Sequence, residues 1–294
     1  RKFILTAVAS MAIGMAGSAS AADLVFSSWG GTTQDAQKAA WADKFTEATG
    51  IKVLQDGPTD YGKIKAMVEA GSVTWEVVDV EGDYAVQAGQ AGLLEKLDFS
   101  VIDKDKLDPR FVTDYSVGSF YYSFVIGCNK DAAGTCPKTW AELFDTAKFP
   151  GKRTFYKWSA PGGIEAALLA DGVPADKLYP LDLDRAFKKL DTIKADIIWW
   201  TGGAQSRLVV PKGTKNKEAA MKFIAQATGS VEQATFAMAT GYAPINLESD
   251  MVLEEKARAA LPDRQSASQV NADMTYWAAN RDAIGERWYA WQAK

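Results

Sequence analysis

The stretch Leu24–Gly31, LVFSSWGG, opens the fold with a short apolar run, two serines, a tryptophan and two glycines. The run Leu24–Phe26 predicts a buried strand. The next segment, 34–49, predicts a helix, because its alanine, tryptophan and phenylalanine residues recur on one face. Gly50 follows where a glycine often ends a helix. The stretch therefore predicts the first strand, turn and helix of an α/β unit.

The turn after this first strand is a candidate ligand contact. In open α/β sheets, ligands bind beyond the carboxyl ends of the strands. Ser28 and Trp29 occupy that position, and Gly30 and Gly31 let the backbone approach a ligand closely. The alternative is an ordinary strand–helix turn with a packed tryptophan. A glycine-rich turn before a helix could also hold a phosphate. These glycines match neither a dinucleotide-binding nor a P-loop pattern, so the signal for phosphate binding is weak.

The same rhythm continues downstream. Strands are predicted at 51–54 and 76–80, and helices at 61–70 and 83–91. A strand–helix–strand order with short connections predicts a parallel sheet covered by helices. The fold class is therefore expected to be α/β.

The middle of the chain contains a long apolar run, 119–127, with the sequence SFYYSFVIG. It predicts either a core strand or a strand that crosses between two domains. The chain has no low-complexity linker, so two apolar halves joined by strands predict two lobes with a hinge. Further helices are expected at 164–170, 183–193, 219–228, 231–240 and from Met274, with one starting at Trp140 and a strand at 154–156.

Composition excludes several functions. The 294 residues carry a net charge of -4 with a pI near 5.1, so neither nucleic acid nor an anionic membrane is an expected partner. Histidine is absent, which removes histidine-ligated metals and Ser-His-Asp chemistry. No cofactor and no metal site are expected. The 10 Trp and 10 Tyr exceed what a core alone needs and suit a ligand cleft.

Residues 1–21 resemble a secretory signal. Two basic residues precede an apolar stretch over 3–15, and Ala19, Ser20 and Ala21 form a cleavage pattern. The alternative is a membrane-anchoring helix, but the apolar stretch is too short for a confident span. The mature protein is expected in the periplasm.

Cys128 and Cys136 are the two cysteines and lie eight positions apart. In an oxidising compartment they predict one disulfide that closes a small loop. A metal or redox pair is the rival interpretation, but the spacing is not that of a CxxC motif.

Carboxylates follow the predicted strand at 76–80 in the sequence VVDVEGDY. Asp79, Glu81 and Asp83 could bind a cation or cap the next helix. Capping is the favoured interpretation for Asp83, and the role of Asp79 stays open. Glu165 lies in the first turn of a predicted helix, where it either complements the helix dipole or serves as the counter-ion of an amine.

A second stretch of tryptophans before glycines, IIWWTGG, covers 197–203. An aromatic wall could form from Trp158, Trp199 and Trp200. A cation facing such a wall would gain a cation–π interaction of ~0.5–2 kcal/mol. The alternative is that these indoles are core, at least for one of Trp199 and Trp200.

Several motifs in order resemble the periplasmic substrate-binding proteins of ABC importers, in particular the spermidine/putrescine branch. They are LVFSSWGG, VVDV, FVIGCNK, TWAELFDTAKFPGKR, VVPKGTKNKEAAMKFI and TGYAPIN. The resemblance implies a type II two-lobe fold that closes on its ligand, no catalysis by this chain, and permease subunits in the inner membrane as partners. It also implies aromatic rings around a methylene chain, with carboxylates at the ammonium ends.

Carried over by motif, the resemblance implies four ligand contacts. Trp29 corresponds to the aromatic residue after the first strand, and Glu165 to an acidic residue early in a second-lobe helix. Trp200 corresponds to a second-lobe aromatic residue in the cleft, and Tyr242 to a late cleft residue. With Ser28 and Asp79 these complete the candidate binding set.

The chain departs from the family where Ser206 is followed directly by Arg207. The family normally continues there through a further segment that returns to the first lobe and contributes ligand contacts. The join therefore predicts an internal deletion. On this basis lobe 1 is expected over 22–123 plus about 207–238, and lobe 2 over about 124–206 plus 239–294.

The expected function is a monomeric periplasmic receptor for a polyamine. The alternative ligand is another small solute, such as an opine, thiamine or an organic acid; an anion would require Arg153 or Arg207 in the cleft. A different-class alternative is an exported hydrolase built on Ser27, Ser28 and Asp79, but the chain has no histidine base and no GxSxG motif. A binding protein that reports to a chemoreceptor is not distinguished by sequence from a transport component.

Overall fold

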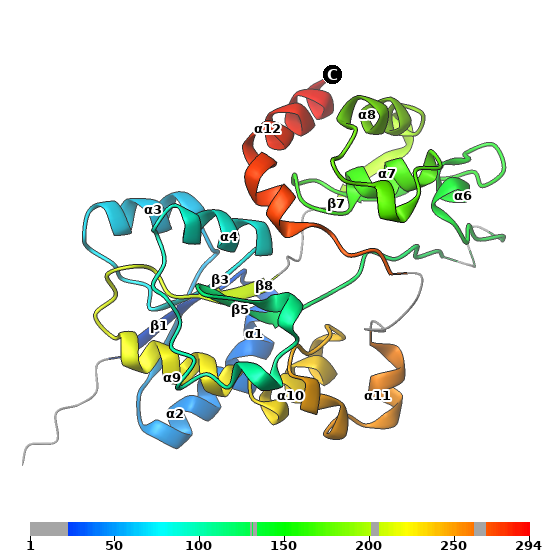
Figure 1. Ribbon diagram of the computed structural model, residues 1–294. Coiled ribbons are helices and arrows are strands. Elements are labelled where there is room, and N and C mark those ends of the chain that lie inside the picture. Colours follow the sequence, from blue (N-terminus) through cyan, green and yellow to red (C-terminus); the bar gives the residue numbers. More distant parts are fainter. Residues whose placement is uncertain (1–22, 130, 132–133, 201–205, 262–268) are drawn as a thin grey trace, which may run out of the picture.

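The larger of two sheets has six strands in the order β2-β1-β3-β8-β5-β4, and the smaller pairs β6 with β7 (Figure 1). The computed structural model describes residues 23–129, 131, 134–200, 206–261 and 269–294. Each sheet lies in its own lobe with its own hydrophobic core, so the predicted α/β class with two lobes is confirmed.

The first lobe is built around the six-stranded sheet. β1 pairs in parallel with β2 and β3, while β8 runs antiparallel to both β3 and β5. The strands are β1 Leu24–Ser27, β2 Val53–Asp56, β3 Val77–Val80, β4 Val112–Thr113, β5 Ser116–Phe120 and β8 Ser206–Val209.

Helices cover both faces of this sheet (Figure 1). Successive side chains of a strand point to opposite faces of the sheet, so the core of this lobe has two parts. Val77 and Leu208 pack on one face, and Val78 and Val209 pack on the other. One face is covered by α3 Tyr61–Glu69 and α4 Gly82–Gln90, the other by α1 Gly31–Gln37, η1 Lys38–Ala42, α2 Asp43–Thr49, α9 Lys217–Ala227 and α10 Ser230–Thr240. The predicted first helix is therefore continuous over three segments, with a π-helical turn at η1, and Gly50 ends it in the left-handed region as expected.

The second lobe is smaller. β6 Arg153–Tyr156 and β7 Ile197–Trp200 pair in parallel, and the helices pack on them. These helices are α6 Trp140–Phe144, α7 Gly163–Ala170, α8 Leu183–Asp191 and α12 Met274–Ala293. α12 also packs against α4 of the first lobe, so it joins the two lobes.

The end of the first lobe differs from the prediction. Residues 239–261 were expected in the second lobe, but Ala243 and Ile245 lie in the core of the first. Tyr121 forms an isolated bridge with Ala243, which ties this segment beside β5. The segment continues through η6 Leu247–Met251 and α11 Glu255–Ala260 before the chain reaches α12. Among the helices and strands of the described residues after 239, α12 is the one that packs in the second lobe.

The long apolar run at 119–127 forms a strand only at its start, where β5 ends at Phe120. Beyond Tyr121 the chain runs into the second lobe without pairing to another strand. Val125 is 76% exposed as a result. The prediction of a crossing segment fits, but its second half has no sheet partner within the described part of the chain.

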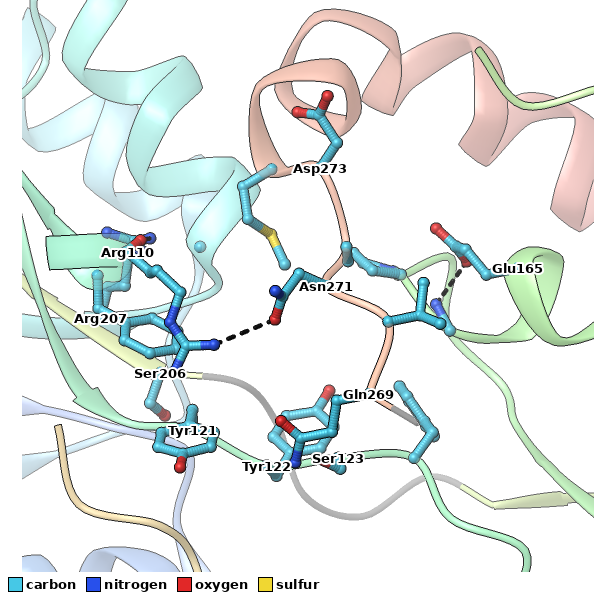
Figure 2. Close-up of a pocket in the computed structure, with 18 of the residues that line it drawn as sticks. Arg110, Tyr121, Tyr122, Ser123, Glu165, Ser206, Arg207, Gln269, Asn271 and Asp273 are labelled. Atoms are coloured by element: carbon cyan, nitrogen blue, oxygen red, sulfur yellow. Dashed lines mark hydrogen bonds between the residues drawn. The ribbon is translucent and has the colours of Figure 1, made fainter. Parts of the chain in front are cut away.

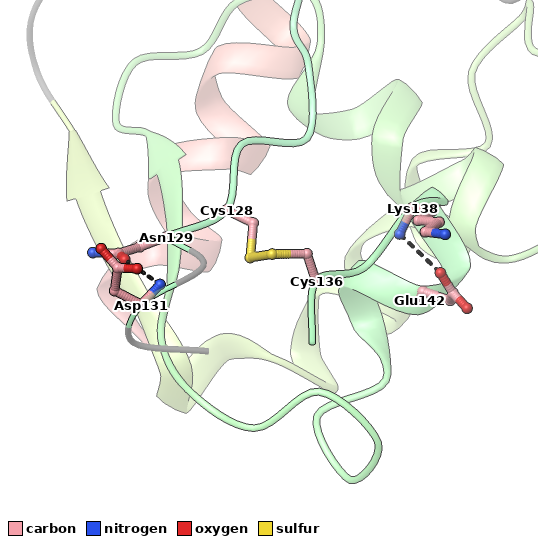
Figure 3. Close-up of a disulfide and its surroundings, with 6 residues drawn as sticks. All are labelled: Cys128, Asn129, Asp131, Cys136, Lys138 and Glu142. Atoms are coloured by element: carbon pink, nitrogen blue, oxygen red, sulfur yellow. Dashed lines mark hydrogen bonds between the residues drawn. A yellow bond between two sulfur atoms is a disulfide. The ribbon is translucent and has the colours of Figure 1, made fainter. Parts of the chain in front are cut away.

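Cys128 and Cys136 form the predicted disulfide beyond this crossing, with a Cα–Cα distance of 5.8 Å (Figure 3). The loop that it closes precedes α6. Within the described ranges, no helix is both long and apolar enough to cross a membrane. The proposed signal over 1–21 lies outside the described residues.

Candidate functional site

A cavity of about 530 Å³ opens between the two lobes (Figure 2). The first lobe contributes residues from η3 Pro109–Phe111, the end of β5 and the start of β8, and the second contributes α7. The segment that leads into α12 runs across it. Its polar and aromatic lining residues are Arg110, Phe111, Thr113, Phe120, Tyr121, Tyr122, Ser123, Trp140, Glu165, Ser206, Arg207, Gln269, Asn271, Asp273 and Thr275.

Arg207 is a buried cation on the wall of this cavity. It lies at the start of β8, its exposed fraction is 5%, and its guanidinium donates to Arg110 O at 3.2 Å and to Ser116 Oγ at 3.4 Å. Burial lowers the pKa of Arg207 to about 10, which still leaves it charged at neutral pH. None of the salt bridges of the described residues includes Arg207. An anion entering the cavity would therefore meet a charge that is not already neutralised.

Arg110 differs from Arg207, although both line the cavity. Its guanidinium donates to both carboxylate oxygens of Asp108, the closest at 2.6 Å, and the salt bridge raises the pKa of Arg110. A further donor reaches Asn271 Oδ1 at 3.3 Å. Arg110 is thus paired and orients Asn271 toward the cavity (Figure 2).

Two carboxylates lie on the other side of the cavity. Glu165 accepts from Gly162 N, Tyr179 Oη and Trp277 Nε1, each at 2.7 Å. Asp273 caps α12 by accepting from Tyr276 N at 2.9 Å and is exposed. Glu165 therefore acts as a buried capping group at the start of α7, in agreement with the interpretation that it stabilises the helix terminus. The exposed Asp273 is freer to contact a ligand.

An ion pair joins the lobes beside the cavity. Arg281 of α12 donates to Glu81 Oε2 at 3.0 Å and also to Asp83, and its guanidinium lies 5.2 Å from the Tyr61 ring. Burial and the adjacent Asp83 carboxylate raise the pKa of Glu81 to about 7, and Arg281 opposes that shift. Glu81 and Asp83, predicted as cation or capping carboxylates, thus serve as the counter-ions of a side chain from the other lobe.

Ser28 and Asp79 lie together, but inside the first lobe. Asp79 accepts from Gln37 Nε2 at 2.5 Å and from Ser119 Oγ at 3.1 Å. Ser28 Oγ donates to Gln37 Oε1 at 2.6 Å. Burial raises the pKa of Asp79 to about 7, against these hydrogen bonds. Neither residue lines the interlobe cavity; they form a buried network between β1, β3, β5 and α1.

The predicted aromatic contacts are dispersed. The Trp29 ring meets Tyr61 edge-to-face at 6.4 Å, near the lobe-joining ion pair. Tyr242 stacks on Phe120 at 4.5 Å, so it supports a cavity residue from behind. Trp200 is exposed on β7 and lines a groove of the second lobe that adjoins the interlobe cavity and shares Phe124 and Trp140 with it. Of the six candidates, Glu165 alone lines the interlobe cavity.

Sequence reasoning named Arg153 and Arg207 equally as sources of an anion site, and the structure separates them. Arg153 donates to the carbonyls of Leu143, Gly151 and Phe149 and is fully engaged in its own lobe. The sequence offered no signal for Asn271 or Asp273, which come from a segment without a recognisable motif. Their place in the site depends on the path of the chain into α12.

The sequence matches the family of bacterial extracellular solute-binding proteins over residues 40–208 and 203–262. The chain belongs to this family. As a member it is a solute-binding component of ABC transporter type and not an enzyme, so the hydrolase alternative is excluded. The interlobe cavity lies where a two-lobe binding protein encloses its ligand.

Similar proteins bind small acids. A γ-aminobutyric acid-binding protein of Pseudomonas aeruginosa is 30% identical over 336 residues, covering 97% of this chain and 95% of that protein. A solved GABA receptor is 69% identical with a TM-score of 0.91, covering 92% of this chain and 98% of that one. A periplasmic binding protein of Agrobacterium tumefaciens R10 in complex with agropinic acid is 30% identical with a TM-score of 0.79, covering 93% and 99%.

The spermidine/putrescine branch predicted from the motifs is too specific. A structure described as a putative spermidine/putrescine ABC transporter from Listeria monocytogenes is 19% identical with a TM-score of 0.73, and that likeness shows the fold alone. The motifs are those of the shared fold, so they indicate the family, while the similar proteins do not support a polyamine as the ligand. The alternative of another small solute fits the similar proteins better.

Proposed function

We propose that this chain is a receptor for a small zwitterionic carboxylate of the 4-aminobutyrate class, which it delivers to the permease of an ABC importer in the inner membrane. The observation that carries the proposal is Arg207, a buried guanidinium on the cavity wall with no ion-pair partner among the described residues. A buried charge is unfavourable until it is paired, so a ligand carboxylate placed there would gain a charge-assisted hydrogen bond.

The opposite end of the ligand would carry the positive charge. Asp273 lines the same cavity with one oxygen committed to its helix cap, so the other can accept from an ammonium group. Tyr121 and Tyr122 supply aromatic surface on the wall of the same cavity. A short amino acid with separated charges matches this order of groups, and the GABA-binding relatives support it.

A polyamine suits the cavity less well. Putrescine has the same four-carbon chain as 4-aminobutyrate but carries an ammonium group in place of the carboxylate. That second ammonium would face Arg207, and two like charges at close range repel each other. The polyamine expectation is therefore replaced by an amino acid.

Calorimetric titration with matched ligands tests the proposal. We expect saturable binding of 4-aminobutyrate, while putrescine, without the carboxylate, binds at least about 100-fold more weakly, since it leaves the buried charge of Arg207 unpaired. Butyrate, without the ammonium, should lose less affinity than putrescine, since its missing partner Asp273 is exposed. Glutarate, which has a second carboxylate in place of the ammonium group, tests whether the site accepts an anion at both ends. Binding of putrescine as tight as that of 4-aminobutyrate, or no binding of any of the four, would contradict the proposal.

Arg207→Gln tests the residue itself. The expected loss of affinity for 4-aminobutyrate is roughly 100-fold, corresponding to about 2–4 kcal/mol for a buried charged contact. Arg258→Gln is the matched control, because it removes the same charge from an exposed side chain that donates to Asp250 O and does not line the cavity. Equal affinities of the two variants, with both folded, would rule out Arg207 as the carboxylate contact.

A further inference from the structure

Ser206 lies beside Arg207 on the wall of the interlobe cavity. It is the first residue of β8 and pairs with Phe120 of β5, which lines the same cavity. Figure 2 shows Ser206 and Arg207 on the same side of the cavity, across from Glu165. Consecutive Cα atoms are about 3.8 Å apart, so the two side chains start close together. Successive side chains of a strand point to opposite faces, so the two reach the cavity from either side of β8.

The hydroxyl of Ser206 is buried without a hydrogen-bond partner. Ser206 is 4% exposed, and its Oγ makes no hydrogen bond to any described residue. A buried donor left unpaired costs stability, so such groups are rare in folded proteins and call for an explanation. Other buried side-chain atoms of the described residues share this condition without lining the cavity: Ser27 Oγ, Trp29 Nε1, Gln55 Nε2 and Ser159 Oγ. Ser206 is therefore the one that lies where a ligand can supply the missing partner.

A buried acid near Ser206 does not supply that partner. Burial raises the pKa of Asp79 to about 7, and the nearby Ser206 is among the side chains that oppose this rise. The Asp79 carboxyl accepts from Gln37 Nε2 at 2.5 Å and from Ser119 Oγ at 3.1 Å. Ser206 makes no hydrogen bond of ordinary geometry to it. The hydroxyl of Ser206 is therefore available to donate to a group in the cavity.

We propose that the Ser206 hydroxyl is a second donor to the ligand carboxylate, beside the guanidinium of Arg207. The inference rests on the proposed function, because it requires a ligand that places a carboxylate at Arg207. A carboxylate has two oxygens that both accept hydrogen bonds, so one can accept from the guanidinium and the other from the hydroxyl. Arg207 supplies the charge, and Ser206 fixes the orientation of the carboxylate.

Ser206→Ala removes the hydroxyl. We expect it to weaken binding of 4-aminobutyrate at least roughly tenfold in a calorimetric titration, since it removes a hydrogen bond to a charged group. The free variant should melt at a temperature no lower than the parent does, because the hydroxyl is unpaired there.

Ser119→Ala is the matched control. It removes the same group from a buried side chain that contacts Asp79 and does not line the cavity. It should leave the affinity unchanged and lower the melting temperature, since a buried hydrogen bond is lost. An equal loss of affinity in the two variants would show that Ser206 acts through Asp79, and would overturn the proposal.

A second pair of variants separates the hydroxyl from the shape of the side chain. Ser206→Thr and Ser206→Val introduce side chains of nearly the same shape, and only threonine retains the hydroxyl. The threonine variant should bind 4-aminobutyrate at least roughly tenfold more tightly than the valine variant. Equal affinities of these two variants, with both folded, would contradict a hydrogen bond from this position.

Butyrate identifies the end of the ligand that Ser206 contacts. It retains the carboxylate and lacks the ammonium group, so Ser206→Ala should weaken its binding by the same factor as that of 4-aminobutyrate. A loss confined to 4-aminobutyrate would assign Ser206 to the ammonium end and overturn the proposal.

The parent protein distinguishes this inference from the proposed function. If it binds butyrate or glutarate but not 4-aminobutyrate, the proposed ligand is wrong, and the same variants test Ser206 with the acid that binds. If it binds none of these acids, both proposals fail.

Discussion

The two lobes share an alternation of strands and helices, but their strands are buried to different extents. In the first lobe every residue of β3, β5 and β8 is buried. In the second, β7 alternates between half-buried and exposed residues. A central strand needs a neighbour on each side and a helix layer on each face. An apolar strand is therefore buried only where neighbouring strands and helices cover it.

The lobes also differ in how they satisfy buried polar groups. The first lobe surrounds a carboxyl group, Asp79, with side-chain donors, and burial raises its pKa to about 7. The second lobe uses a guanidinium, Arg153, which donates to backbone carbonyls at 2.5 to 2.8 Å. Since guanidinium stays charged throughout the physiological range, only the first of these arrangements responds to pH.

The largest expected effect compares equal truncations in the two cores. Phe223→Ala removes a fully buried ring that packs against Phe26 and Phe45, and it should reduce the free energy of unfolding by about 3–5 kcal/mol. Phe155→Ala should cost less, because that ring lines the groove of the second lobe and is 8% exposed, whereas Phe223 is fully buried. Urea unfolding of both variants measures the difference, and a larger loss for Phe155→Ala would invert the comparison.

Next is the pH response of the first lobe. The folded-state pKa of Asp79 lies above its ordinary value of 3.8, so the folded state binds this proton more tightly than the unfolded chain. The stability that this group contributes is present at about pH 4 and is lost as the pH rises through about 7.

Asp79→Asn stays neutral, and at pH 8 it should be more stable than the parent by roughly 2–4 kcal/mol, with little difference near pH 4. Unfolding by urea at several pH values checks this. Parallel stability curves for parent and variant would show that the buried carboxyl does not titrate in this range.

Reduction of the disulfide should act on the second lobe alone. Cys128 and Cys136 are separated by eight positions, and opening a loop of this size reduces stability by ~2–3 kcal/mol in the loop-entropy model. Hydrogen exchange around α6 should accelerate after reduction, while that of β1 and β3 stays unchanged. A uniform acceleration over both lobes would show that they unfold as one unit.

The smallest effect concerns the joining of the lobes. Arg281→Gln removes the pair with Glu81 and Asp83, which links α12 of the second lobe to the first lobe. We expect about fivefold weaker ligand binding, roughly 1 kcal/mol, with a larger radius of gyration in solution. Arg287→Gln, on the same helix but paired with the exposed Asp184, is the control and should change neither quantity. Identical scattering from both variants would mean that the ion pair does not hold the lobes together.

Much of the fold was predictable, because its elements follow from local patterns. The helices at 61–70 and 83–91 became α3 and α4 with shifts of about one residue, and the paired cysteines formed their disulfide. Helical and strand periodicity depends on neighbours within a few positions, so the sequence contains this information directly. The family followed from the order of these motifs.

The binding site was less predictable. Ser28 and Asp79 are polar residues at strand ends, as ligand contacts often are, yet the tertiary structure buries them in a network of the first lobe. Trp29 and Tyr242 are aromatic residues that pack on other rings. Residue type and position in a strand cannot distinguish a side chain that faces a cleft from one that faces a neighbouring helix.

By itself, therefore, the sequence determined the α/β elements, the two-lobe family and the disulfide, all of which rest on short-range patterns and their order. Only the tertiary structure decided that Arg207 would lie on the cavity wall while Arg153 capped carbonyls within one lobe. It also decided that Asn271 and Asp273 would line that cavity. The physical reason is that a cavity between lobes is formed by chain segments more than a hundred positions apart, whose packing no local pattern records.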